Sequence, residues 1–310
     1  MKNKKYGELR NKWRGIIRQY EDRSEIVNYD EPSFPSYSYI GHMDASATWN
    51  KKVHWHQDVE FMTIISGKMA YNINGSCVEL KAGDTIFVNS KQLHWTKDID
   101  NIYCRYIITV IHPRLLISSP EVECEYVLPV ISSKEIPYII FRNGTKNAKS
   151  AAKILRELNS NNGNQFEITR CFFELWHYIF ESFKKNKSDA DKNSADLLGQ
   201  TNFHHIESLK NMIGFIKENF AQKISLQEIA DTGFMSKSTC NSVFKKYTGH
   251  TPSDYLIRHR IDRAQELLLS TDQTISQISA KCGFCSPSYM TEQFVRCCNS
   301  TPSEFRKKRE

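Results

Sequence analysis

The chain has 310 residues, 40% of them hydrophobic and 25% charged, with a formal net charge of +7 at pH 7. This length allows two domains that each bury a core, and the ordinary composition excludes a disordered or fibrous chain. No apolar run is long enough to span a membrane, and no apolar segment follows the basic residues at the start, so we expect neither a membrane partner nor a secretory leader.

The cysteine content indicates reduced thiols. Nine cysteines are an odd number, and without a leader they favour a cytoplasmic protein. Cys282 and Cys285, followed by Cys297 and Cys298, have spacings that zinc sites use. Because Cys282 falls on an apolar position of a predicted helix, we prefer the interpretation without zinc.

The first twenty residues predict a basic amphipathic helix. Apolar side chains recur at helical spacing among lysines and arginines, at Leu9, Trp13, Ile16, Ile17 and Tyr20. We expect this helix to pack on the domain that follows, with membrane contact as the alternative.

Residues 37–111 predict short β-strands. Segments 61–65, 69–73, 77–80, 85–88 and 103–110 are rich in β-branched and aromatic residues, and turn sequences at Gly67, Gly75 and Gly83 separate them. Short strands at this spacing are typical of a sandwich or small barrel.

Four residues of the kind that bind metals lie among these strands: His54, His56, Glu60 and, beyond Gly83-Asp84, His94. A strand would turn His54 and His56 to the same face, because successive side chains alternate. The pattern resembles the cupin fold, whose two motifs bring two histidines, a glutamate and a third histidine together. Such a set suits iron, manganese, nickel or zinc. Thr48 and Asn89 depart from the cupin pattern, which has glycine and proline there, so metal is the alternative and we assign no cofactor.

From residue 151 the apolar spacing becomes helical. Apolar stripes on either side of a polar break at 159–165 predict a helical pair over residues 151–184, packed on the barrel. Residues 185–202 are polar and predict a flexible linker. Ile206, Leu209, Ile213 and Ile216 then begin an all-α domain over residues 203–310.

The last eighty residues contain a repeat with a period of 50. Thr251-Pro252-Ser253 matches Thr301-Pro302-Ser303, and Phe244 matches Phe294. Each copy, at about 225–246 and 275–296, predicts a helix-turn-helix unit. Ser225 and Ser236 would cap the two helices of the first unit, and Gly233 would allow its turn. Pro287 suits the first turn of the corresponding helix in the second unit.

The outward positions of the second helix in each unit are mostly polar or basic, and can reach bases or phosphates in a major groove. We predict DNA contacts from Ser236, Lys237, Ser238, Thr239, Asn241, Ser242, Lys245, Lys246, Pro287, Ser288, Tyr289, Thr291, Glu292 and Arg296. The second helix of the second unit has Val295 where the first has a lysine. Glu292 would repel phosphate, or could instead accept from a cytosine amino group. We therefore expect the first unit to contribute more to binding.

The two units and the helix between them resemble the AraC/XylS family of bacterial transcription regulators. The similarity lies in Arg260-Ile261, Ala264, Leu267-Leu268, Ile278, Gly283-Phe284, Ser288-Tyr289, Phe294 and Thr301-Pro302-Ser303-Glu304-Phe305-Arg306. It implies a DNA-binding transcription regulator or activator that contacts RNA polymerase and is not an enzyme. It also implies that part of the helical pair joins two copies into a homodimer, and that the two recognition helices enter adjacent major grooves.

The resemblance further implies that the barrel senses a small molecule. Aromatic faces with a few hydrogen-bonding groups suit a sugar or related metabolite. The candidate effector-binding residues are Tyr39, His42, His54, His56, Glu60, Tyr71, His94 and Trp95. A metal-dependent cupin enzyme joined to a DNA-binding domain, and a regulator without any effector, are the alternatives.

We thus predict an α+β multidomain protein. A cupin-like barrel with its amphipathic helix occupies residues 1–150, the helical pair 151–184, the linker 185–202, and the DNA-binding domain 203–310.

Overall fold

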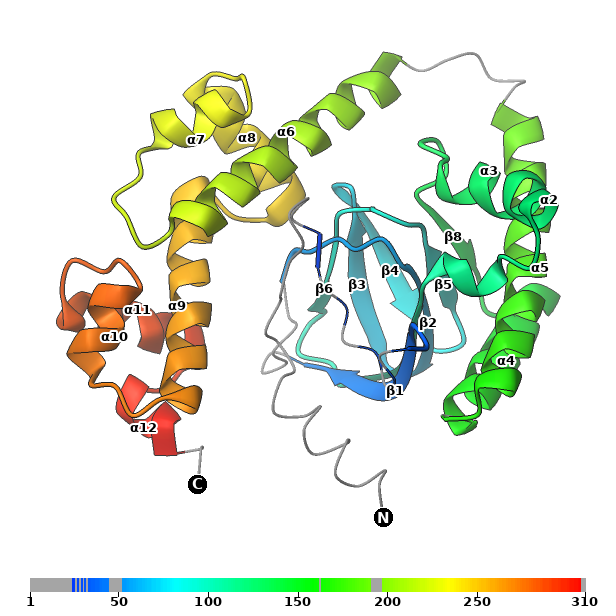
Figure 1. The fold of residues 1–310 in the computed structure, drawn as a ribbon, viewed down its shortest axis with the longest axis horizontal. Helices are drawn as coiled ribbons and strands as arrows, with labels where there is room; N and C mark the ends of the chain where they lie inside the picture. The colour runs from blue at the N-terminus through cyan, green and yellow to red at the C-terminus, as the bar shows by residue number, and fades with distance from the viewer. Residues whose placement is uncertain are drawn as a thin grey trace. The chain divides into compact units, whose positions relative to one another are not determined.

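The computed structural model describes residues 24, 25, 27, 29, 31, 33–44, 52–161, 163–190 and 197–307. The chain divides into two compact units, Met1–Thr201 and Asn202–Glu310 (Figure 1). The amphipathic helix predicted over residues 1–20 lies outside the described residues. No helix in the described part is long and apolar enough to cross a membrane.

Two antiparallel sheets form the barrel of the first unit. One has the order β1-β7-β2-β5-β8 and the other β4-β3-β6. The strands are β1 (Ser36–Met43), β2 (Val59–Ser66), β3 (Lys68–Ile73), β4 (Ser76–Lys81), β5 (Thr85–Val88), β6 (His94–Asp98), β7 (Cys104–Ile111) and β8 (Tyr138–Phe141). The predicted segments correspond to β2, β3, β4, β5 and β7, whereas β1, β6 and β8 were not among them.

Alternation along the strands of the five-stranded sheet produces two cores. In β2, Met62 and Ile64 belong to the core inside the barrel, together with Met69 and Tyr71 of β3. Phe61 belongs instead to a core that the same sheet shares with helices. This sheet is therefore apolar on both faces, which explains why β2 and β7 are buried along most of their length.

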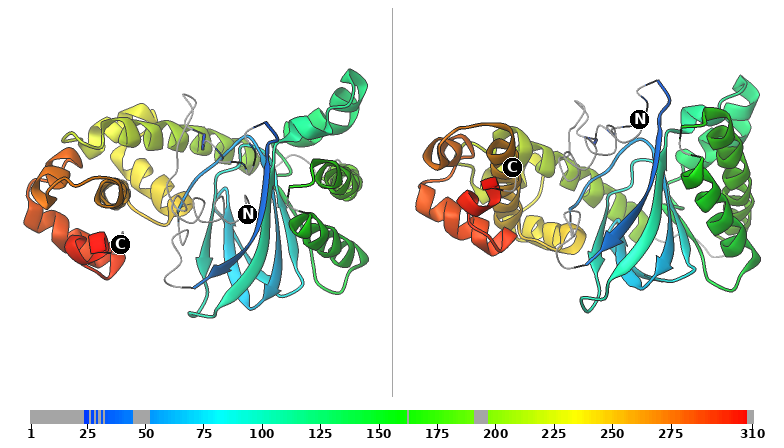
Figure 2. Two further views of the ribbon diagram at one scale, coloured as in Figure 1. Left: turned by 60° about the horizontal axis from the view of Figure 1, so that its bottom comes forward. Right: turned by 90° about the horizontal axis from the view of Figure 1, so that it is seen from below.

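Helices cover the outer face of the five-stranded sheet. Helix α4 (Lys146–Ser160) and helix α5 (Gln165–Ala190) lie side by side against it (Figure 2). Before them come η1 (Pro113–Leu116), α2 (Pro120–Val122), the π-helical turn η2 (Glu123–Val127) and α3 (Leu128–Ile131). Trp176 of α5 donates a hydrogen bond from Nε1 to the carbonyl of Tyr126, which fixes this short helical region to α5.

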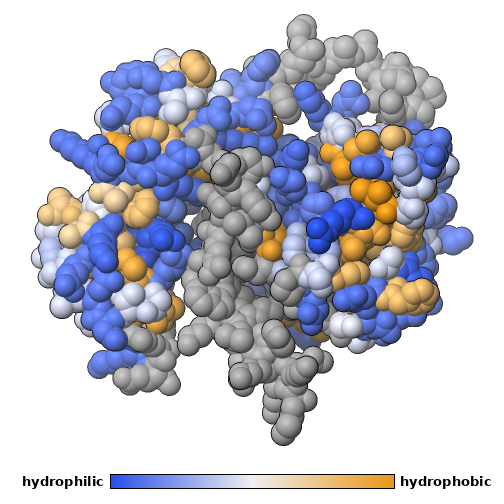
Figure 3. All heavy atoms as spheres, in the orientation of Figure 1, coloured by the Kyte–Doolittle hydropathy of each residue, from blue (hydrophilic) through white to orange (hydrophobic). Residues whose placement is uncertain are grey.

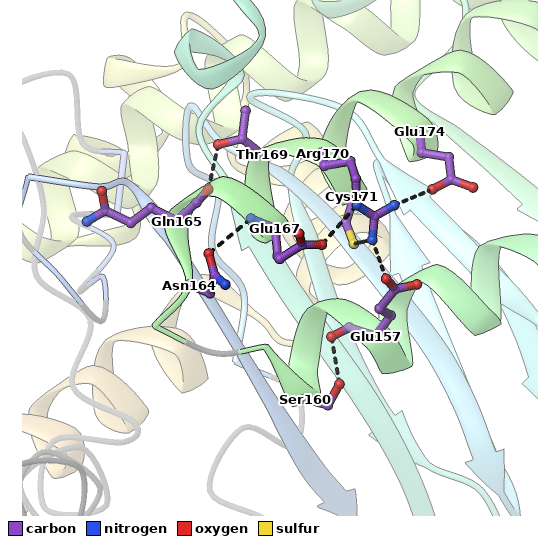
Figure 4. A network of polar contacts seen from close by, with 9 residues as sticks. All are labelled: Glu157, Ser160, Asn164, Gln165, Glu167, Thr169, Arg170, Cys171 and Glu174. Carbon is purple, nitrogen blue, oxygen red and sulfur yellow. Dashed lines mark hydrogen bonds and ion pairs between the residues drawn. The ribbon is translucent and has the colours of Figure 1, made fainter.

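A charged cluster joins α4 to α5 on their outer side (Figure 4). Arg170 donates from Nε to Glu167 at 2.9 Å and from Nη1 to Glu174 at 3.1 Å, and its third nitrogen pairs with Glu157 of α4. One guanidinium thus serves three carboxylates through its fixed fork of donors.

Helical structure extends into the segment that was predicted as a flexible linker. Helix α5 continues to Ala190, and α6 (Leu197–Asn219) begins before the expected end of the linker. The linker prediction is therefore wrong for residues 185–190 and 197–202. A polar composition indicates that a segment buries little apolar surface, but it does not exclude a helix. Residues 184–190 contain no proline or glycine, so α5 can continue through them.

The second compact unit contains most of α6 and the two helix-turn-helix units. The first pairs α7 (Leu226–Thr232) with α8 (Lys237–Thr248), and the second pairs α10 (Ile275–Lys281) with α11 (Pro287–Cys298). Helix α9 (Pro252–Ser270) joins them, and α12 (Pro302–Lys307) ends the unit. The predicted caps are confirmed, since Ser225 accepts from the Glu228 amide and Ser236 from the Thr239 amide.

The turns of the two helix-turn-helix units differ at one position. In the second unit Gly283 adopts the left-handed conformation, with φ of +74°, whereas Phe234 does so in the first, with φ of 54°. Gly233 ends α7 at this turn with φ of −93°, so it does not supply the left-handed conformation. Gly233 is needed for space, because a Cβ there would lie 2.8 Å from Sδ of Met212. Phe234 is 93% exposed, so little packing offsets its strain.

We expect Phe234→Gly to raise the free energy of unfolding by about 1 kcal/mol, because glycine adopts the left-handed conformation without steric cost. Gly283→Ala should lower it by about 1–3 kcal/mol, since its Cβ would lie 2.7 Å from the carbonyl oxygens of Phe220 and Ala221. Urea denaturation of the full chain measures both. Phe234→Ala is the control that removes the ring but keeps the strain; a gain equal to that of Phe234→Gly would contradict the explanation.

Candidate functional site

Helix α8, the recognition helix of the first helix-turn-helix unit, presents a polar and basic outer face. Cys240, Val243 and Phe244 are buried beneath it. The predicted DNA contacts Ser236, Lys237, Ser238, Ser242, Lys245 and Lys246 are exposed, and Thr239 and Asn241 are half-buried. The Ser236 hydroxyl accepts from the Thr239 amide as helix cap, which commits one of its lone pairs to the fold. The amide N–H groups and lysines at this helix surface are suited to phosphate and base edges.

Helix α11, the recognition helix of the second helix-turn-helix unit, carries less unpaired positive charge than α8. Pro287, Ser288, Glu292 and Arg296 are exposed, and Tyr289 and Thr291 are half-buried. Arg296 lies 3.5 Å from the carboxylate of Asp254 on α9, which neutralises part of its charge. Val295 is 41% exposed, and Asn299 ends the helix in the left-handed conformation. That the first helix-turn-helix unit binds DNA more strongly stays a prediction, and the pairing of Arg296 with Asp254 is a geometric argument for it.

Two strands of the N-terminal compact unit, and the segment that precedes the first of them, bring His54, His56, Glu60 and His94 together. His54 and His56 precede β2, Glu60 lies in β2, and His94 begins β6. His54 and His94 form an isolated antiparallel bridge, with mutual backbone hydrogen bonds of 3.1 and 2.9 Å. One ligand atom from each of the four residues lies within 4.8 Å of the others.

The three imidazole rings are held in the same way. Each Nδ1 faces a backbone carbonyl: that of Lys52 at 3.0 Å for His54, Asp58 at 3.1 Å for His56 and Gln92 at 2.8 Å for His94. A carbonyl only accepts, so each Nδ1 carries the proton of its hydrogen bond. Each Nε2 therefore turns toward the centre of the cluster, which is the orientation that metal-binding histidines take when a backbone carbonyl fixes their tautomer.

Glu60 is the buried charge at the centre of this histidine cluster. Its Oε2 lies 3.6 Å from Nε2 of both His56 and His94, and its Oε1 accepts a short hydrogen bond from the Tyr71 hydroxyl of β3. Burial alone would raise the pKa of Glu60, but its contacts with His56 and His94 outweigh burial and hold the pKa far below its usual value. Burial and the charge of Glu60 raise the pKa of Tyr71, which therefore stays a hydrogen-bond donor.

The histidines divide by charge. Burial and the neighbouring rings of His94 and His56 lower the pKa of His54 well below its usual value, so this ring is neutral. Burial opposes the charge of His56 as well, but the contact with Glu60 and the nearby carboxylates of Asp58 and Glu25 raise its pKa to about 9. In the metal-free state, one proton on His56 balances the Glu60 carboxylate.

A divalent cation fits this arrangement. His94 is 2% exposed, and its Nε2 is a buried polar atom without a hydrogen-bond partner. Such an orphaned acceptor is costly unless something binds it. Three imidazole nitrogens and one carboxylate are donors that zinc, iron, nickel and manganese accept. The cluster is the only such group that the described residues contain, and the cysteines at 282, 285, 297 and 298 do not form another.

Two of the predicted effector-binding residues lie elsewhere. His42 pairs with Arg105 on the outer face of β1, is exposed, and stacks on Tyr103 with ring centres 5.6 Å apart. Trp95 follows His94 in β6 and so points to the opposite face of its sheet. Both were predicted from residue type alone, and strand alternation removes both from the histidine cluster.

Tyr39 lies on the inner face of β1, with the core inside the barrel, and stacks on Tyr37 with ring centres 5.9 Å apart. No sequence motif predicted two further residues beside the cluster. Glu25 lies 3.7 Å from His54, and Asp58 accepts from the Tyr29 hydroxyl at 2.7 Å. Both contacts join positions far apart in the sequence, with no motif to connect them.

Two domain families match the regions that contain the recognition helices and the histidine cluster. A helix-turn-helix domain family matches residues 229–308, and a cupin domain family matches residues 43–110. An uncharacterised helix-turn-helix transcriptional regulator of Bacillus subtilis, YdeC, is 27% identical over 82% of this chain and 86% of its own length. The transcriptional activator RhaS of Escherichia fergusonii is 32% identical over 83% of this chain and 88% of its own length.

Among solved structures, an AraC-type DNA-binding transcriptional regulator from Chromobacterium violaceum is 31% identical over 33% of this chain and 91% of that one, with a TM-score of 0.32. The relationship to RhaS extends over both units, and the two domain families match the barrel and the paired helix-turn-helix units. The chain therefore belongs to the AraC family and is a DNA-binding regulator of transcription.

Proposed function

We propose that this regulator acts in the cytoplasm as a homodimer, that it responds to a ligand bound at the histidine cluster, and that it acts on transcription through contact with RNA polymerase. The observation that carries the proposal is a buried set of inward-facing ligand atoms in the same chain as two exposed recognition helices. Helices α8 and α11 would enter adjacent major grooves, about 34 Å apart along the duplex. Ligand binding would change how the two DNA-binding units of a dimer are placed.

A divalent cation is the ligand that the geometry supports best. Glu60, Tyr71 and His94 are buried, and Met62, Ile64 and Met69 fill the barrel core beside them. A sugar would have to displace this packing, whereas an ion needs only the space between the four ligand atoms. The family relationship alone does not favour an ion, and the small polar effector remains the competing ligand class.

The same four ligands also suit a metal-dependent enzyme, which is the second candidate function for the barrel. Turnover would need an open coordination position and access for a substrate. The relatives are named as transcription regulators, which favours a sensor. The two functions separate experimentally, because a sensor changes DNA affinity when the ligand binds and an enzyme need not.

The outward side of α5 supports a homodimer. Phe166 and Phe173 lie seven residues apart, so they share one face of the helix, and they are 77% and 40% exposed. Further exposed apolar side chains, Tyr126 and Leu128, lie in the short helical region beside α5. Figure 3 shows apolar patches among the hydrophilic surface of this unit. Exposed aromatic side chains of this kind are typical anchors of protein interfaces.

If α8 contacts phosphates, Lys237→Ala and Lys245→Ala will each weaken DNA binding and reduce the salt slope by about 1, because each lost lysine releases one counterion fewer. Binding of the full chain to DNA selected from a randomised pool, measured over a range of salt concentrations, gives both values. Lys210→Ala on α6, where the lysine pairs with Glu207, serves as control. An unchanged slope in both α8 variants would remove the phosphate role.

We expect the wild-type chain to bind one divalent ion and His94→Gln to bind it at least about tenfold more weakly, since a ligand is lost. His42→Gln, which changes a histidine on the outer face of β1, should bind like the wild type. Titration with Zn²⁺, Mn²⁺ and Ni²⁺ followed by metal analysis tests this. Ion binding should also change affinity for the selected DNA by about 5–150-fold. If sugars raised the unfolding temperature and no ion bound, the cation proposal would be wrong and the ligand would be an organic effector.

The double substitution Phe166→Glu with Phe173→Glu should raise the dissociation constant of the dimer by about 30-fold or more, because one aromatic anchor contributes about 2 kcal/mol. Analytical ultracentrifugation of the full chain measures it. Ile102→Glu, at another exposed apolar position of the first unit, is the control. A dimer of unchanged affinity in the double variant would place the interface elsewhere.

A further inference from the structure

Tyr71 places a buried hydroxyl group beside the histidine cluster. It belongs to β3, is 1% exposed, and is part of the core inside the barrel. On β3 it lies two residues before Ile73, which pairs with His94 of β6, so both side chains leave the same face of the strand. The rings of Tyr71 and His94 lie side by side, with their centres 6.0 Å apart. Strand pairing thus fixes this hydroxyl next to the cluster.

The two oxygen atoms of Glu60 have different partners. Oε1 accepts the short hydrogen bond from the Tyr71 hydroxyl, whereas Oε2 faces Nε2 of His56 and Nε2 of His94, at 3.6 Å each. Glu60 is 3% exposed, so water competes little for either oxygen. Because the hydroxyl donates its one proton to Oε1, Tyr71 holds this oxygen on its own side of the carboxylate. One oxygen of Glu60 is thereby left for the centre of the cluster.

A single donor atom from Glu60 limits the number of ligands that the cluster offers. A carboxylate can bind a cation through one oxygen or through both. With one oxygen committed to Tyr71, the three histidines and Glu60 supply one atom each, and a ligand atom of each lies within 4.8 Å of the others. Four ligands suit zinc, which is usually tetrahedral. Two ligands of one zinc ion lie about 3.4 Å apart in a tetrahedron and about 3.0 Å apart at adjacent octahedral positions, and the two 3.6 Å distances are nearer the first value.

We propose that Tyr71 is a positioning residue of the cation site, which holds Glu60 as a one-oxygen ligand and so favours a four-coordinate ion such as Zn²⁺. This inference rests on the cation site proposed above. For Glu60 to bind through both oxygens, Oε1 would have to leave Tyr71, and a buried hydroxyl would lose its acceptor. Tyr71 thus acts on the ion through Glu60 and does not need to touch it.

The test uses the full chain freed of metal with a chelator, and Co²⁺, which replaces Zn²⁺ and whose visible absorption weakens as its number of ligands rises. Tyr71→Phe removes the hydroxyl and keeps the ring. It should weaken Co²⁺ binding by about 10–100-fold, and lower the molar absorbance of the bound ion because Glu60 can then bind through both oxygens. In the wild type, the infrared difference between the Zn²⁺-bound and metal-free chain should show the wide separation of carboxylate stretching bands that one-oxygen coordination produces.

Tyr106→Phe is the matched control, since Tyr106 is another buried tyrosine of the barrel core and its hydroxyl interacts with Tyr39. It should behave like the wild type in Co²⁺ affinity and absorbance. Thermal unfolding of the metal-free variants verifies that each is folded, and the infrared measurement needs no variant. Tyr71→Phe with wild-type affinity and absorbance, or closely spaced carboxylate bands in the wild type, would overturn the role of Tyr71 and leave the cation site intact. A wild-type chain that binds no Co²⁺ would instead overturn the cation site itself, and the role of Tyr71 with it.

Discussion

The first unit depends on how it accommodates one buried negative charge. A carboxylate inside a protein is costly unless it is paired and hydrogen-bonded, and Glu60 lies in β2 between an apolar core and three histidines. Tyr71 donates to one of its oxygens, and His56 balances the charge of the other. Tyr71 lies in β3 and His94 in β6, both in the three-stranded sheet, so the two sheets must pack together before Glu60 has all of its neighbours. The electrostatics of the site and the closure of the fold are therefore one requirement.

This arrangement leaves the cluster incomplete in a specific way. His56 satisfies Glu60 with a proton, but Nε2 of His94 stays buried beside this carboxylate without a hydrogen-bond partner. A site built only for stability would not keep such conflicts, since replacing the polar groups with apolar ones removes their cost. Atoms that are held rigidly and left unsatisfied indicate preorganisation for a ligand.

In the second compact unit, one helix, α9, supports both recognition helices. Helix α9 contributes Ile261, Ala264 and Leu268 to the core of the second helix-turn-helix unit, and its Tyr255 packs on Phe244 of the first. Arg260 of α9 donates to the carbonyls of Phe220 and Gln222, just before the first helix-turn-helix unit. Helix α9 thus contacts both helix-turn-helix units and links α8 to α11.

Much of this protein could be predicted from local sequence signals. The helix-turn-helix units, their caps at Ser225 and Ser236 and the left-handed end at Asn299 follow from residue type and spacing, because these features depend on contacts within a few residues. The four members of the cluster were likewise found by spacing. The strand β8 and the helical ends of the supposed linker were not, since their stability comes from neighbours that are remote in the sequence or from helix propensity without burial.

Tertiary structure alone decided which side chains meet. Strand alternation turned His42 and Trp95 away from the cluster, although their types matched those of residues that lie within it. Folding brought Glu25 beside His54 and Tyr71 beside Glu60, pairs that no motif connects. The sequence by itself determined the family, the repeat and the kinds of ligand atoms available, because these are properties of order along the chain. The direction in which each atom points, and whether a buried atom finds a partner, depend on pairing between strands and could be known only from the folded chain.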